Sequence, residues 1–134
     1  MLDKKKVTKE NILKILEFLP YFESEDHVFF QIDNQNLMDP YVYDGKVLDF
    51  IKTLYDENII YSFDWVKWQP EAIEYYDSLD LLKNADLDTL RKLLTVHIRK
   101  ERFCSGHLAQ VIKTGHLLNI LKRLNEIKFQ LFSK

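Results

Sequence analysis

The stretch D-L-D-T-L-R-K-L-L-T-V-H-I-R-K-E-R, residues Asp86–Arg102, decides the fold. Asp86 is a favoured N-cap residue. The apolar positions after it recur three and four residues apart, at Leu87, Leu90, Leu93, Leu94 and Ile98. This is the pattern of an amphipathic helix with one wide apolar face. The stretch therefore predicts a helix to about Arg102 whose apolar face lies in the core.

Further helices are predicted on both sides of this one. Apolar residues repeat at helical spacing in residues 8–19, 44–57, 106–113 and 116–129, and a shorter helix is expected from Pro70 to Tyr76. Thr8, Asp44 and Ser105 are the expected N-caps, Pro20 should stop the first helix, and Pro70 should occupy a first helical turn. Gly115 fits the left-handed position that ends a helix.

The remaining segments are less regular. Residues 78–85 read as a linker, while residues 27–43 contain β-favouring side chains around a possible turn. The expected fold is all-α or mostly α, a compact bundle of five or six helices with a possible short β-hairpin near residues 27–43. Residues 1–134 should form a single helical domain. Within it, the stripe of Leu90, Leu94 and Ile98 should pack against the helix that carries Leu117, Leu121 and Leu124.

Charge is distributed unevenly along the chain. Residues 91–134 hold ten Lys and Arg but only two acids, whereas residues 1–90 hold nine lysines and nineteen acids. A basic half of this kind indicates an anionic partner, either nucleic acid or an acidic protein surface. The alternative is that the two halves neutralise each other within the fold.

Composition also bears on the compartment. No apolar run approaches the roughly 20 residues of a membrane span, and the start, Met-Leu-Asp-Lys-Lys-Lys, lacks the apolar segment of a signal peptide. A single cysteine cannot form an internal disulfide. We therefore expect a cytoplasmic protein without membrane contact.

The chemically versatile residues gather in T-V-H-I-R-K-E-R-F-C-S-G-H-L, residues 95–108. The pattern H-x-R-x-x-R-F-C-x-G-H-L over His97–Leu108 resembles the signature of an uncharacterised bacterial family, a domain of unknown function. The resemblance continues upstream in F-x-W-x-x-W-Q-x-E-A, from Phe63, and downstream in Gly115-His116, so that it covers about residues 20–127. It implies no activity, substrate or cofactor.

Arginines in this region are candidates for ligand binding. Arg91, Arg99 and Arg102 lie near one row of the predicted helix, and guanidinium groups in a row could grip phosphate or carboxylate. With His107, they form the predicted ligand-binding set. The alternative is a solvated helix face, or ion pairs with the acidic half.

Histidine and cysteine suggest a second type of site. Glu101, four residues after His97, could orient its ring for general base catalysis, and Cys104 could be a nucleophile with His97 or His107 as base. Cys104 with His97, His107 and His116 could also form a zinc set. The competing interpretations are a structural histidine and a cysteine that packs beside Phe103 between two helices, and we predict that Cys104 is buried and unliganded. We predict no metal and no cofactor.

The leading hypothesis for function is a small binding or regulatory module that engages an anionic partner through a basic helix. The alternative is an enzyme or metal-binding domain centred on His97, Cys104 and His107. A third possibility is an interaction domain whose motif is only its folding core. The sequence predicts neither the substrate nor the oligomeric state.

Overall fold

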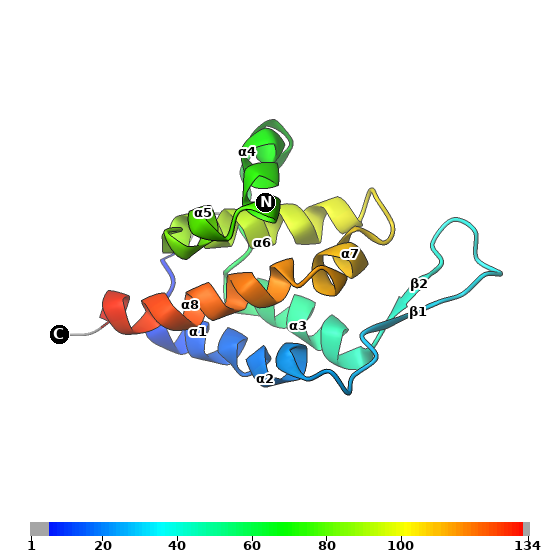
Figure 1. Cartoon of the computed structure of the whole chain (residues 1–134), viewed down its shortest axis with the longest axis horizontal. Helices are drawn as coiled ribbons and strands as arrows, with labels where there is room; N and C mark the ends of the chain where they lie inside the picture. The colour runs from blue at the N-terminus through cyan, green and yellow to red at the C-terminus, as the bar shows by residue number, and fades with distance from the viewer. Residues whose placement is uncertain (1–5, 133–134) are drawn as a thin grey trace.

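The computed structural model describes residues 6–132, with side chains up to Gln130. Its elements, in chain order, are α1 (Lys9–Leu16), α2 (Leu19–Glu23), β1 (Phe30–Ile32), β2 (Tyr41–Tyr43), α3 (Gly45–Asp56), α4 (Trp65–Asp77), α5 (Leu79–Lys83), α6 (Leu87–Glu101), α7 (His107–Lys113) and α8 (His116–Phe132). The fold is mostly helical with one short hairpin, as predicted (Figure 1). None of the described helices is long and apolar enough to cross a membrane.

Several helix ends form where the sequence predicts them. The Asp86 side chain accepts a hydrogen bond from the Thr89 N–H at 2.8 Å, which caps α6. Thr8 caps α1 in a reciprocal bond pair with Asn11, the arrangement of a capping box. Gly115, at φ +84°, takes the left-handed conformation between α7 and α8.

The helices are more numerous than the five or six predicted, because two short ones were missed. Pro20 does not simply stop α1, since it lies in the first turn of α2, where its missing N–H costs nothing. The predicted linker contains α5, whose N-cap Ser78 accepts from the Leu81 N–H at 3.2 Å. α4 begins at Trp65 rather than Pro70, because Asp64 caps it through the Lys67 N–H at 3.2 Å.

The core lies between α6 and α8, with α1, α3 and α7 around them. α8 packs against α1, α2, α5, α6 and α7, and α4 packs on α6 (Figure 1). The two predicted stripes are buried and their helices are in contact, which confirms the predicted packing of these two helices: Leu90, Leu94, Ile98, Leu117, Leu121 and Leu124.

The hairpin projects from the helical body on the side of the α6–α7 turn (Figure 1). Its strands pair antiparallel, with Gln31 opposite Val42 at the centre. The Ser105 hydroxyl donates to Asp39 at 2.7 Å and so ties the hairpin loop to the α6–α7 turn. The Tyr41 ring also packs closely against Gly106, so closely that a Cβ at this position would overlap the ring.

Candidate functional site

Glu101 organises the turn that carries the sequence motif. Its carboxylate accepts hydrogen bonds from the Leu108 N–H at 2.7 Å and the Gly106 N–H at 3.2 Å. It therefore satisfies backbone donors at the start of α7, where Gly106 at φ +92° is the N-cap and has no side chain to offer. Two predictions fail here, since Ser105 is not the cap and Glu101 does not orient His97.

Tyr43 joins the hairpin to the same turn. Its hydroxyl accepts from the Ala109 N–H at 3.0 Å and is hydrogen-bonded to Glu101. Burial, and then the hydrogen bond to this carboxylate, raise the pKa of Tyr43. The charge of Glu101 is therefore engaged by two backbone amides and a phenol.

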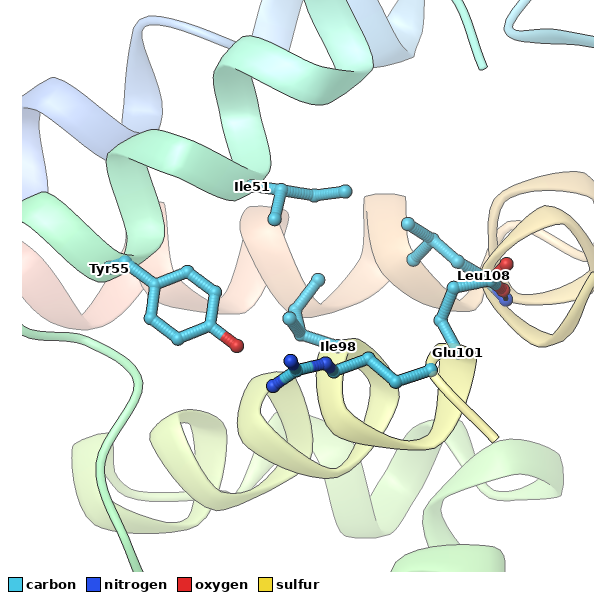
Figure 2. A pocket seen from close by; sticks show the side chains of 6 residues that line it. Ile51, Tyr55, Ile98, Glu101 and Leu108 are labelled. Carbon is cyan, nitrogen blue, oxygen red and sulfur yellow. Dashed lines mark hydrogen bonds between the residues drawn. The ribbon is translucent and has the colours of Figure 1, made fainter. Parts of the chain in front are cut away.

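A pocket of about 360 Å³ opens beside Glu101. Figure 2 shows Ile51 and Tyr55 reaching it from α3, Ile98 and Glu101 from α6, and Leu108 from α7. Its remaining lining residue is Arg102. Most of these side chains are apolar, which suits a ligand with an aliphatic or aromatic group.

Two of the predicted ligand-binding arginines stand at this pocket. Arg102 lines it and is exposed, and the Arg99 guanidinium lies 5.9 Å from the ring centroid of Tyr55. Within residues 6–130, no carboxylate lies at ion-pair distance from either arginine. The pocket thus combines an apolar lining with one cation, Arg102, while a second, Arg99, lies near the Tyr55 ring, and neither has an acidic partner in the described chain.

Arg91, the third predicted arginine, is buried. Only 4% of it is exposed, and its guanidinium donates to the Asn58 carbonyl at 2.8 Å and the Ile59 carbonyl at 3.2 Å. It also lies 4.7 Å from the ring centroid of Tyr61, and burial lowers its pKa. Arg91 therefore holds the chain after α3 and is not exposed to a partner, so its place in the predicted ligand-binding set is wrong.

Three histidines form a separate cluster, which does not line the pocket. His97 of α6, His107 of α7 and His116 of α8 surround Tyr76 of α4, with ring centroids 4.9 to 6.5 Å from the tyrosine ring. His97 Nδ1 and His107 Nε2 are 3.0 Å apart, so one ring donates to the other. His107, the fourth predicted ligand-binding residue, thus lies in this cluster and does not line the pocket.

Burial sets the ionisation of the cluster. His97 is fully buried, and its Nε2 and that of His116 have no hydrogen-bond partner in the described chain. Desolvation lowers the pKa of His107 and of His116 to about 4, and that of His97 well below its ordinary value. The three rings are therefore neutral near pH 7.

Cys104 does not join the histidines. It is exposed on the α6–α7 turn, so the prediction of a buried thiol is wrong. The apolar partner expected beside it, Phe103, is also exposed and stacks on Trp65 with ring centroids 6.0 Å apart. Of the candidate catalytic residues, the fold brings together His97 and His107 alone. No group of three His, Cys, Asp or Glu in the described chain could hold a metal ion as placed.

The fold and site define a mostly helical domain with a basic and apolar pocket beside a hairpin. Residues 7–130 match the family of unknown function DUF6508, and the chain belongs to that family. No curated protein and no solved structure matches it.

Several residues of the site were not predicted. Tyr43, Ile51, Tyr55 and Tyr76 lie 20 to 60 residues away from the motif in sequence, and each meets it only through tertiary packing. The one usable signal was the apolar face predicted for residues 44–57, which contains Ile51 and Tyr55. Leu54 of that face is buried in the core, whereas Ile51 and Tyr55 lie at its edge, are only partly buried and line the pocket.

Proposed function

We propose that this domain is a binding module for an acidic protein segment. Arg99 and Arg102 would pair with the partner's carboxylates, and an aliphatic or aromatic side chain of the partner would enter the pocket beside Ile51 and Tyr55. The observation that carries the proposal is the absence of a carboxylate partner for either arginine within residues 6–130, at the rim of an apolar pocket.

Two features favour acidic protein over nucleic acid, the other anionic partner predicted from the charge pattern. Nucleic-acid interfaces gather many Lys and Arg along a backbone, whereas burial removes Arg91 from this row. Single-stranded nucleic acid also needs open aromatic faces for base stacking. Here Trp65 and Trp68 stack on Phe103 and Tyr75 and pack against the core.

The histidine cluster gives weaker support to an enzyme than the pocket gives to a binding module. Its two central rings are hydrogen-bonded to each other, and the proposed nucleophile Cys104 lies outside the cluster. A base needs a reactive group within hydrogen-bond reach. We therefore treat the cluster as part of the folding core.

The test is a selection of random octapeptides displayed on phage against the full chain. We expect enriched peptides to carry Asp or Glu close to Leu, Ile, Met or Phe. Arg102→Glu should weaken the affinity of a selected peptide about tenfold or more, since it replaces attraction by repulsion at the rim. Lys122→Glu, which makes the same charge change at an exposed position of α8, should leave the affinity within about twofold.

Three results would overturn the proposal. One is a selection that enriches no peptide, and another is an enriched pool without acidic bias. The third is binding of labelled single-stranded DNA or RNA that is tighter than any selected peptide and sensitive to Arg102→Glu. The third result would indicate that the anionic partner is nucleic acid. Salt should weaken peptide binding in every successful outcome, because exposed charges are screened.

A further inference from the structure

The hairpin offers a free strand edge to the same site. Outside the paired strands, the Asp33 N–H donates to the Pro40 carbonyl at 2.6 Å and the Asp44 N–H to the Phe29 carbonyl at 2.8 Å. In an antiparallel ladder, every second residue pair is hydrogen-bonded. The pair between Gln31 and Val42 lies midway between these two bonded pairs, so the backbone N–H and carbonyl of Val42 also point toward β1. The N–H and carbonyl groups of Tyr41 and Tyr43 therefore point away from β1.

This free edge runs along a groove. A cavity of about 670 Å³ is lined by Tyr41, Val42 and Tyr43 together. Neighbouring side chains of a strand point to opposite faces, so three consecutive residues can line one cavity only along the strand's edge. The opposite walls come from α3, through Leu48 and Ile51, and from the α6–α7 turn.

The groove is continuous with the arginine pocket. Both cavities are lined by Ile51, Glu101 and Arg102, so an extended chain beside β2 would pass the apolar pocket and its cation. Met38, 91% exposed, and Phe103, 76% exposed, also line the groove. An exposed strand edge bordered by apolar side chains and free of a covering segment is a template for another strand.

We propose that the partner segment binds by strand addition, as a third strand on the free edge of β2. The inference rests on the proposed function and adds its geometry: an extended acidic segment. Its backbone would hydrogen-bond to Tyr41 and Tyr43, its apolar side chain would enter the Ile51 pocket, and its carboxylate would meet Arg102. The acidic character follows from charge complementarity, because Glu101 is engaged by backbone amides and Tyr43 while Arg102 has no partner in residues 6–130.

Amide hydrogen exchange of the free protein gives the first test. Tyr41 and Tyr43 amides should exchange at least about tenfold faster than those of Val42 and Asp44, which face β1. Equal protection at all four positions would overturn the inference, because the edge would then already be covered. This measurement requires no ligand and no variant.

The second test uses a peptide selected as described above. Its backbone nitrogens are methylated one at a time, which removes single N–H donors while retaining the side chains. Strand addition predicts alternation, with about tenfold or greater loss at every second position and little loss between them. The unaffected positions are the matched control, and the Tyr41 and Tyr43 amides should gain protection in the complex.

The outcomes separate the two proposals. If acidic peptides bind but tolerate methylation at every position, strand addition is refuted and the proposed function stands. If no peptide is selected, both fall. If sedimentation shows the free protein dimerising at micromolar concentration, with protection of Tyr41 and Tyr43 rising in step, the occupant is a second copy and the acidic partner is refuted.

Discussion

Acidification should destabilise this protein through its histidine cluster. His97, His107 and His116 have pKa values lowered in the fold, the latter two to about 4, against an ordinary value of 6.5. The main cause is desolvation, with Lys100 lowering the values of His97 and His107 further, while Asp77 opposes the shift at His116. These histidines therefore take up protons near pH 6.5 in the unfolded chain, whereas in the folded chain His107 and His116 take them up only near pH 4. The free energy of unfolding is therefore at its full value above pH 6.5 and decreases as the pH falls toward 4.

The size of the effect follows from these values. Between pH 7.5 and pH 5, a histidine titrating at 6.5 unfolded and at about 4 folded costs the folded state about 2 kcal/mol. His107 is partly exposed, so its share is reduced for solvent screening. We expect His116 to lower the free energy of unfolding by about 2 kcal/mol over this range, and His97 and His107 to lower it further, against the roughly 5–15 kcal/mol typical of a domain.

Guanidinium denaturation at several pH values, followed by circular dichroism, measures this loss. His116→Gln should reduce the difference between pH 7.5 and pH 5 by about 2 kcal/mol, whatever it does to stability at pH 7.5. His27→Gln, the same substitution at an exposed position outside the cluster, is the matched control. A wild-type loss below about 1 kcal/mol, or an unchanged loss in His116→Gln, would refute the assignment to buried neutral histidines.

Further predictions concern the motif and its surroundings. Gly106→Ala should destabilise the fold by about 2–3 kcal/mol in denaturant titrations, since φ is +92° and the new Cβ would meet the Tyr41 ring, whereas Gly45→Ala has open space and should be neutral or mildly stabilising. Arg91→Met should cost about 2–3 kcal/mol by leaving two carbonyls unpaired, against less than about 1 kcal/mol for Lys92→Met at its half-buried ion pair; similar losses in both would contradict the structural role. Cys104 should react with iodoacetamide about as fast as a cysteine in a short peptide, and slow reaction would contradict its exposure. Elemental analysis should find less than about 0.1 zinc per chain, and near one zinc would restore the metal hypothesis.

Local patterns predicted the helices well and their partners poorly. The first residues of α1 and α6 follow from the N-caps Thr8 and Asp86, because a cap acts on backbone groups within three residues. The start of α4 and the existence of α5 were missed, although Asp64 and Ser78 are equally good caps. In those segments the apolar spacing is short and weak, and packing of α5 on α8 stabilises what the local signal does not.

The contacts of the motif residues were predicted wrongly. A spacing of four made Glu101 the natural partner of His97, yet the backbone turn at Gly106 brings two unsatisfied amides to that carboxylate instead. His97 then finds His107, ten residues away, through the α6–α7 turn. Local spacing cannot predict such an exchange, because it depends on where the turn directs α7.

The uneven charge of the chain can now be weighed against its two explanations. If the basic and acidic halves neutralised each other directly, long-range ion pairs should join them. Among residues 6–130, the ion pairs instead lie within one half or join close neighbours: Lys14–Glu57, Lys52–Asp56, Lys92–Asp88 and Arg123–Glu126. The carboxylate nearest the two pocket arginines in sequence, Glu101, is engaged by backbone amides. Their charges therefore remain available to an external acid, and the peptide selection with Arg102→Glu tests that consequence directly.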